Sequence, residues 1–167
     1  DVPHTIDLYN RALSEFEITP YVSRPVIHRE QLLPVPPELA DRTNLVAIAP
    51  GAAHATKQWP IERFQQVARL LIERHACHIL WVAVGSDQLA PTTRASFGDS
   101  LTELIDWPLE QLAPLLARAS VTISNDSGLM HLASAVGTPV IAIFGPTHST
   151  LGFSPRGLHD QMIEVDE

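Results

Sequence analysis

Short apolar runs alternate with amphipathic segments over most of this chain, and this alternation restricts the fold more than any other feature. The runs are almost continuously hydrophobic, which is typical of strands buried on both faces of a parallel sheet. We expect strands at residues 45–50, 77–84, 101–105, 121–124 and 140–144. Between them we expect helices at residues 60–74, 90–97, 108–118 and 128–136. The pattern predicts an α/β fold, a doubly wound parallel sheet with helices on both faces.

The first 44 residues have a different character. Residues 4–17 predict a short amphipathic helix, because apolar side chains recur in them at helical spacing. These positions are Ile6, Tyr9, Leu13 and Phe16. Residues 19–41 are rich in proline, which favours an extended connector. We therefore divide the chain into a helix and connector at residues 1–44 and a domain at residues 45–167. The N-terminus has no initiator methionine and no signal-peptide pattern, so we interpret the chain as part of a longer protein.

Composition argues against several classes of function. The net charge of −8 disfavours a general nucleic-acid binder. No stretch approaches the roughly 20 apolar residues that a membrane-spanning helix requires. The single cysteine, Cys77, rules out an internal disulfide and is expected to be buried near a strand. The eight histidines lack the spacing and the accompanying acidic or cysteine ligands of a metal site, so we expect none.

Ligands of doubly wound sheets bind outside the carboxyl ends of the strands, so the loops that follow the strands are the candidate sites. The first loop, Gly-Ala-Ala-His-Ala-Thr-Lys at residues 51–57, combines small residues with Thr56 and Lys57. Small residues let backbone N–H groups approach an anion, and a lysine adds positive charge. The alternative is an ordinary solvated loop. The loop matches neither the P-loop motif nor the glycine motif of dinucleotide-binding folds.

The second loop is Gly-Ser-Asp at residues 85–87, directly after a strongly apolar run. An acidic side chain at this point can accept hydrogen bonds from the hydroxyls of a ribose, which makes Asp87 a candidate nucleotide contact. The alternative is that Asp87 caps or precedes the next helix.

The third loop is the polar stretch that follows residues 121–124. Asn125, Asp126 and Ser127 are all residues that cap helices, Gly128 allows a close backbone approach, and His131 lies about one turn further on. A helix N-terminus with free N–H groups attracts anions. One cap is enough to begin a helix, so the surplus of polar residues favours a sugar–diphosphate site over capping alone. A purely structural role for His131 is the alternative.

In their order along the chain, these segments resemble one known family. PGAAHATKQWPIERF, VAVGSD and SNDSGLMHLASAVGTPVIAIFGPT are similar to the C-terminal half of the ADP-heptose:lipopolysaccharide heptosyltransferases, glycosyltransferase family nine. The resemblance covers about residues 45–155, and residues 4–17 resemble the segment that joins the two domains of that family. One departure is His148-Ser149, where the family commonly has Asp-Pro after Gly-Pro-Thr.

The resemblance implies one half of a GT-B glycosyltransferase, a Rossmann-like C-terminal domain that holds the nucleotide sugar. By motif, Thr56 and Lys57 would bind the diphosphate, and Asp87 would lie near the ribose. The diphosphate and the heptose would contact residues of the third loop and of the helix expected after it: Asp126, Ser127, Gly128, Leu129 and His131.

The resemblance also implies an activity: inverting, metal-independent transfer of heptose from ADP-heptose to the lipopolysaccharide inner core, with no cofactor. The family's general base is an aspartate of the N-terminal domain, which this chain lacks, so we expect the chain to bind the donor without turnover. The acceptor would bind through that domain. The reaction would take place in the cytoplasm, at the inner face of the bacterial inner membrane. Peripheral association of the protein with this membrane would be compatible with a lipid acceptor. Two alternatives stay open: a non-catalytic nucleotide-sugar-binding module, and a GT-B enzyme that uses another nucleotide sugar. Nucleic acid is not an expected partner.

Overall fold

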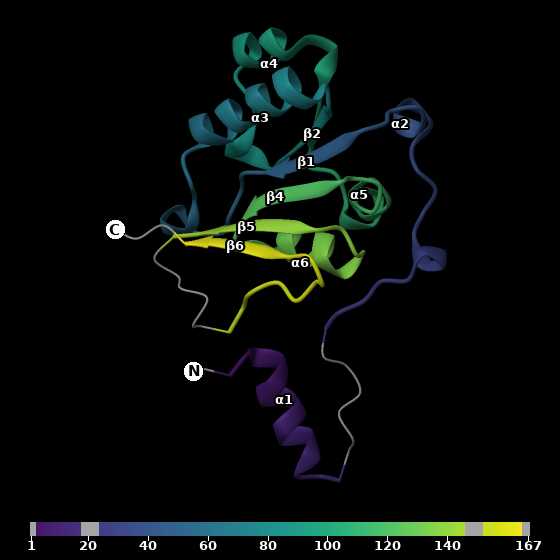
Figure 1. The fold of residues 1–167 in the computed structure, drawn as a ribbon, viewed down its shortest axis with the longest axis vertical. Coiled ribbons are helices and arrows are strands. Elements are labelled where there is room, and N and C mark those ends of the chain that lie inside the picture. Colours follow the sequence, from purple (N-terminus) through teal and green to yellow (C-terminus); the bar gives the residue numbers. More distant parts are fainter. Residues whose placement is uncertain (1–2, 18–23, 146–151, 165–167) are drawn as a thin grey trace.

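The computed structural model describes residues 3–17, 24–145 and 152–164. Their core is a six-stranded parallel sheet in the order β3-β2-β1-β4-β5-β6 (Figure 1). The strands are β1 (Leu45–Ala49), β2 (His78–Ala83), β3 (Leu101–Ile105), β4 (Val121–Asn125), β5 (Val140–Phe144) and β6 (Gln161–Glu164). The α-helices are α1 (Thr5–Ser14), α2 (Pro37–Ala40), α3 (Ile61–His75), α4 (Pro91–Phe97), α5 (Leu109–Leu116) and α6 (Gly128–Ala135).

Hydrophobic cores lie on both faces of the sheet, because the side chains of each strand alternate between the faces. On one face, Ala47 of β1 belongs to a cluster with Leu115 of α5 and Met130 of α6. On the other face, Ile48 of β1 belongs to a cluster with Phe64 of α3. The prediction of a doubly wound α/β fold is confirmed, and the strand order is that of a Rossmann-like domain.

The strand order reverses at β1, and this reversal positions the candidate site. β1 pairs with β2 on one side and with β4 on the other, so that Ile48 lies opposite Trp81 and Ala49 lies opposite Ser124. After β1 the chain passes to α3 on one face, whereas after β4 it passes to α6 on the other. Loops that diverge in this way leave a crevice at the carboxyl edge of the sheet.

The element boundaries differ from the sequence-based expectations mainly at the ends. The helix expected at residues 4–17 is the shorter α1, and the helix expected to reach residue 118 ends at Leu116. β6 was not expected, because its four residues are all exposed and carry no buried apolar pattern. Cys77 is buried as predicted, and Trp81 lies in the core with none of its surface exposed.

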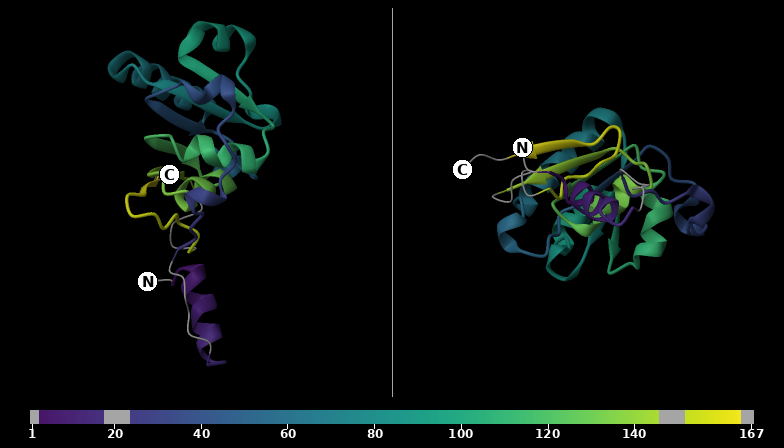
Figure 2. Two further views of the ribbon diagram at one scale, coloured as in Figure 1. Left: turned by 90° about the vertical axis from the view of Figure 1, so that its right-hand side faces the viewer. Right: turned by 90° about the horizontal axis from the view of Figure 1, so that it is seen from below.

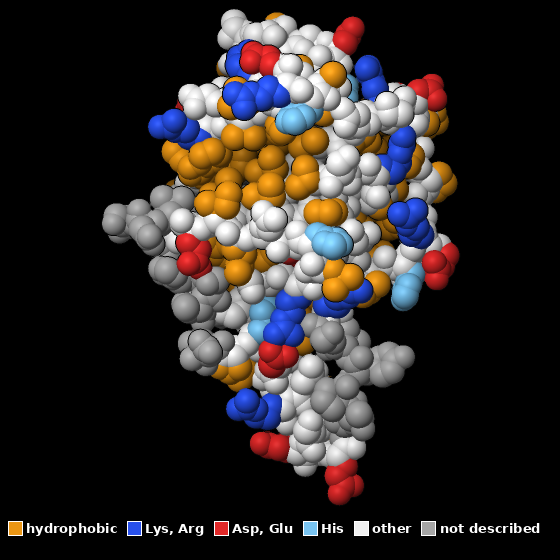
Figure 3. All heavy atoms as spheres, viewed as in Figure 1, with side chains coloured by type: hydrophobic (Ala, Val, Ile, Leu, Met, Phe, Trp, Pro, Cys, Tyr) orange, Lys and Arg blue, Asp and Glu red, His pale blue; other side chains and the backbone are white. Residues whose placement is uncertain are grey.

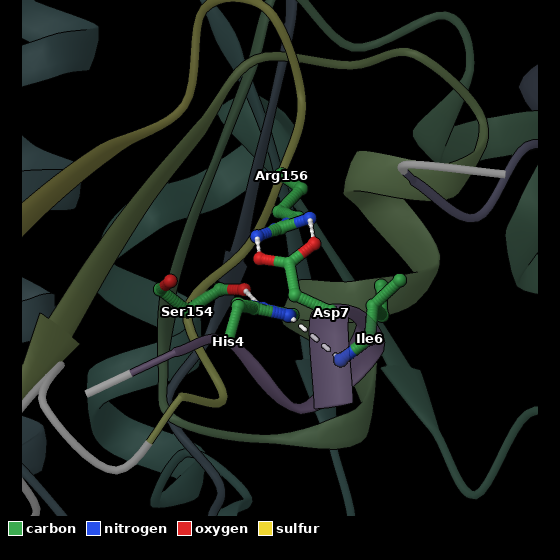
Figure 4. A network of polar contacts seen from close by, with 5 residues as sticks. All are labelled: His4, Ile6, Asp7, Ser154 and Arg156. Atoms are coloured by element: carbon green, nitrogen blue, oxygen red, sulfur yellow. Dashed lines mark hydrogen bonds and ion pairs between the residues drawn. The ribbon is translucent and has the colours of Figure 1, made fainter. Parts of the chain in front are cut away.

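Helix α1 lies apart from the sheet, as both views show (Figures 1 and 2), and none of its residues is buried. Polar contacts at its first turn attach it to the segment before β6 (Figure 4). The Thr5 N–H donates to the Gly152 carbonyl at 3.0 Å, and Asp7 accepts two hydrogen bonds from the Arg156 guanidinium. The attachment of α1 is thus polar and close to the surface.

The surface in Figure 3 has a hydrophobic patch above and to the left of the centre of the view, with acidic and basic side chains scattered around it rather than gathered by sign. Among the residues that the structure describes, no helix is both long enough and apolar enough to cross a membrane.

Candidate nucleotide-sugar site

The loops after β1, β2 and β4 meet around one cavity at the carboxyl edge of the sheet. The cavity has a volume of about 530 Å³. Gly51 and Ala52 line it from the first loop, Asp87 lines it from the second, and Ser127 and Gly128 line it from the third. Its wall also contains the apolar side chains of Val82, Val84, Leu109 and Leu129. An apolar cavity with a few convergent polar groups is typical of a small-molecule site.

Lys57 directly precedes Gln58 of the cavity wall and forms an ion pair with Asp126, which directly precedes Ser127 of the same wall. Their Nζ and Oδ2 atoms are 2.5 Å apart, and the side chains are 26% and 10% exposed, respectively. The lysine belongs to a short 3₁₀ turn, Ala55–Lys57, in which its N–H donates to the His54 carbonyl at 2.9 Å. An ammonium has three N–H donors, and Asp126 accepts one of them, so the same lysine can also bind an anion. Thr56, next to it, is exposed.

Asp87 has two close neighbours at the cavity wall, one on β2 and one in the loop after β1. Its backbone carbonyl accepts a hydrogen bond of 3.0 Å from the indole N–H of Trp81. Its carboxylate lies so close to Gly51 that a Cβ at residue 51 would overlap it. Burial raises the pKa of the Asp87 carboxyl above its ordinary value, and a hydrogen bond from Ser86 opposes this shift.

The N-terminus of α6 opens toward the cavity. Ser127 is the N-cap residue by position, but its side chain makes no capping hydrogen bond. Instead its hydroxyl is 3.0 Å from the Ser124 hydroxyl. A Cβ at Gly128 would meet no atom within 4 Å, so there is free space in front of the first turn. Ser127 therefore begins α6 without capping it through its side chain.

His131 lies in a different cavity from Asp87, Ser127 and Gly128. This second cavity, of about 210 Å³, is formed with residues of α1 and of the segment 152–156. Burial lowers the pKa of the His131 imidazole, His4 lowers it further, and the carboxylates of Asp126 and Asp160 oppose the shift. The eight residues named from the sequence thus fall into three groups: the cavity wall with Asp87 and residues 127–129, the Lys57–Asp126 pair with the adjacent Thr56, and His131 in the second cavity.

Asn125 has a role that sequence reasoning missed. It was expected to be a capping residue in the polar loop, but it is the last residue of β4 and is fully buried. Its side chain hydrogen-bonds the backbone at Pro50 and at Trp59, on either side of the loop that carries Lys57. The one signal in the sequence was a polar residue that directly continues an apolar strand.

The described residues contain no group of three or more His, Cys, Asp and Glu side chains placed to hold a metal ion. Pro146 and Thr147 of the Gly-Pro-Thr segment, together with His148-Ser149, fall in residues 146–151, outside the part of the chain that the structure describes.

Comparison with known proteins decides the family. The model of glycosyltransferase family 9 (heptosyltransferase) matches residues 9–159. The chain belongs to this family. Among curated heptosyltransferases, lipooligosaccharide heptosyltransferase 2 of Haemophilus influenzae is 29% identical over 109 residues, which are 62% of this chain and 32% of that protein. Lipopolysaccharide heptosyltransferase 1 of Escherichia coli is 33% identical over 100 residues, which are 56% of this chain and 31% of that protein. The chain thus spans about a third of the length of these relatives.

Solved heptosyltransferases share the fold. A family 9 glycosyltransferase from Veillonella parvula superimposes with a TM-score of 0.74 at 23% identity, over 99% of this chain and 50% of that one. An E. coli heptosyltransferase solved with ADP gives a TM-score of 0.62 at 24% identity, over 79% of this chain and 40% of that one. The same enzyme solved with ADP-2-deoxy-2-fluoro heptose gives 0.58 at 25% identity, over 77% and 38%.

Proposed function

We propose that this domain binds ADP-heptose as the donor in a heptosyl transfer to the lipopolysaccharide inner core. The observation that carries the proposal is the meeting of three strand-end loops around one cavity of about 530 Å³, with the first residue of α6 in its wall and the Lys57–Asp126 ion pair next in sequence to wall residues. Relatives at about 30% identity are heptosyltransferases of lipopolysaccharide or lipooligosaccharide, and solved relatives contain ADP or a heptose analogue of the donor.

The parts of the donor can be assigned to parts of the site by their chemistry. The nucleoside suits the apolar cavity, where the Asp87 carboxylate can accept hydrogen bonds from the ribose hydroxyls. The diphosphate suits the space between Lys57 and the first turn of α6, with Thr56 as a further donor, because both the ammonium and the helix N-terminus attract negative charge. The heptose then extends toward His131 and Asp126.

Transfer in the complete enzyme follows from this arrangement. We propose an inverting, metal-independent displacement in which an aspartate of an N-terminal domain deprotonates the acceptor hydroxyl. Lys57 and the α6 N-terminus stabilise the negative charge that develops on the leaving ADP. The residues described here therefore bind the donor but do not transfer it by themselves. The reaction takes place in the cytoplasm, at the inner face of the inner membrane, where the lipid acceptor allows peripheral association.

Isothermal titration with ADP tests the assignment. The wild-type chain should bind ADP, and Lys57→Ala should weaken binding by about tenfold or more, since a charged contact to phosphate contributes at least about 1.4 kcal/mol. Asp126→Ala should also weaken binding, because it releases the lysine from its position. Arg94→Ala removes a positive charge from an exposed side chain that lines a different cavity, and it serves as the matched control.

Unchanged ADP affinity in both Lys57→Ala and Asp126→Ala would refute the site. Titrations with UDP and GDP test the alternative of another nucleotide sugar: tighter binding of either than of ADP would favour that alternative. A full-length protein that binds ADP-heptose but transfers no heptose to an acceptor would favour the non-catalytic module.

A further inference from the structure

We propose that Asn125 is a positioning residue of the donor site, which holds the loop 51–58 so that Lys57 faces the diphosphate. The inference rests on the proposed function, since it concerns the same site. It assigns to a single buried amide the task of fixing both ends of the loop.

The contacts of the Asn125 side chain use both halves of its amide. The Nδ2 group donates to the Pro50 carbonyl at 2.5 Å, and the Oδ1 atom accepts from the Trp59 N–H at 3.0 Å. The chemistry of the partners determines the orientation of the amide, because a carbonyl can only accept and an N–H can only donate. Asn125 is fully buried, so water does not compete for these bonds.

Between these two anchors the loop is held by a few polar contacts rather than by packing in the core. Residues 53–56 are exposed and bury no side chain in the core. Within the loop, the Gln58 side chain donates to the Ala52 carbonyl at 3.0 Å. Gly145, which follows β5, lies close to the loop: a Cβ at Gly145 would be 3.1 Å from the Thr56 carbonyl oxygen. The path of residues 51–58 therefore depends on where Asn125 holds its ends.

Asn125 and its neighbour Asp126 act on the same loop at different points. Asn125 binds the backbone on either side of the loop, and Asp126 binds the Lys57 ammonium at 2.5 Å. Both side chains come from the end of β4, whose register against β1 is set by the sheet. The position of the lysine is consequently determined by β4, and a change at Asn125 should act on ADP binding through Lys57.

A double-mutant cycle distinguishes this role from a merely structural one. Asn125→Ser shortens the side chain so that it cannot reach both partners, and Asn125→Ala removes it. Affinity for ADP is measured by titration in the wild type, in each Asn125 variant, in Lys57→Ala and in the double variants. Thr122→Val, another buried change on β4, is the matched control because the Thr122 hydroxyl has no partner among the described residues.

We expect each Asn125 variant to lose about fivefold to tenfold in ADP affinity in the wild-type background, which is a typical size for a lost positioning contact. In the Lys57→Ala background the same change should cost less than about twofold, because the group that Asn125 positions is already gone. Thr122→Val should bind ADP as the wild type does. Circular dichroism melts confirm that all titrations are made on folded protein, and either of the two Asn125 variants is enough for the cycle.

Equal losses in the two backgrounds would overturn the inference, because a general structural defect does not depend on Lys57. Unchanged ADP affinity in both Asn125 variants would overturn it as well, while leaving the proposed function in place. Failure of the wild-type chain to bind ADP would overturn both.

Discussion

Polar contacts attach the loop that carries Lys57 to β4 and attach helix α1 to the segment before β6, but only the first of these attachments is buried. Asn125 hydrogen-bonds the backbone beside the loop from a position with no exposed surface. Helix α1 has no buried residue, and the Asp7 side chain that pairs with Arg156 is 45% exposed. A hydrogen bond that is shielded from water is costly to break, because the groups left behind stay unsatisfied. An exposed ion pair exchanges its partner for water at little cost.

The two regions also differ in how they shift the pKa of a carboxyl group. The hydrogen bond from Arg156, with smaller charge effects from Arg156, His4 and Arg11, lowers the pKa of the Asp7 carboxyl even though burial opposes the shift. At Asp87 the effect of burial is larger than that of the hydrogen bond from Ser86, and the pKa of the carboxyl is therefore raised. The charged form of the Asp7 carboxyl is thus stabilised by its partner, whereas burial disfavours the charged form of the Asp87 carboxyl.

Replacing the buried amide should have the largest effect on stability. Asn125→Ala leaves the Pro50 carbonyl and the Trp59 N–H without their partner, and we expect the free energy of unfolding to fall by about 2–4 kcal/mol. Urea denaturation followed by circular dichroism measures this. A loss below about 0.5 kcal/mol, the size typical of surface changes, would remove the distinction between the loop and α1.

Gly51→Ala should weaken the binding of ADP while changing the stability of the protein little. The added Cβ overlaps the Asp87 carboxylate, which can rotate away because it is the end of a side chain. We expect unfolding to change by less than about 1 kcal/mol, while the affinity for ADP falls by about tenfold. The control is Asp87→Ala: in that background Gly51→Ala should add no further loss, and an additive loss would show that Gly51 acts through another group.

Acidification should weaken ADP binding through Asp87. The raised pKa means that this carboxyl takes up a proton at a higher pH than an ordinary aspartate does. A protonated carboxyl accepts hydrogen bonds from ribose poorly, so affinity should fall as the pH drops through the raised pKa and should recover above it. Titrations from pH 7.5 to pH 4.5 should show this slope in the wild type and a weaker slope in Asp87→Asn, which also controls for protonation of ADP. Identical slopes would exclude Asp87 as the titrating contact.

The Thr122→Val variant tests whether a buried polar group stabilises the protein only when it has a hydrogen-bond partner. The Thr122 hydroxyl is buried on β4 and, among the described residues, has no hydrogen-bond partner. Valine has nearly the same shape, so we expect stability to rise by up to about 1 kcal/mol, opposite in sign to the change at Asn125. Thermal melts of both variants on the same instrument make the comparison. A large loss of stability in Thr122→Val would reveal a partner for the hydroxyl.

Asp7→Asn should have the smallest effect. It removes the charge of an exposed ion pair, so the melting temperature should stay as in the wild type, whereas amide hydrogen exchange within α1 should become faster. Mass spectrometry of exchanged peptides separates α1 from the sheet. If the melting temperature fell as far as it does in Asn125→Ala, α1 would be an integral part of the domain rather than a surface attachment.

Much of the fold and part of the site could be predicted because their signals are local. Near-continuous apolar runs such as residues 45–49 and 78–83 indicate buried parallel strands, and the carboxyl ends of such strands always share one edge. Asp87 and Ser127 could therefore be placed at one site although 40 residues separate them in the sequence. The exposed strand β6 could not be found in this way, since no burial pattern marks it.

The doubly wound sheet, the family and the edge at which the strand-end loops meet could be read from the amino-acid sequence, because hydrophobic spacing and motif order are properties of neighbouring residues. Three features required the folded chain: the Asn125 side chain hydrogen-bonds the backbone at Pro50 and Trp59, Ser127 makes no side-chain cap on α6, and His131 lines a separate cavity. Asn125 and Pro50 are 75 residues apart, and Asp126 and Lys57 are 69 residues apart. Contacts over such separations depend on the register of β4 against β1, and that register results from the packing of the whole sheet.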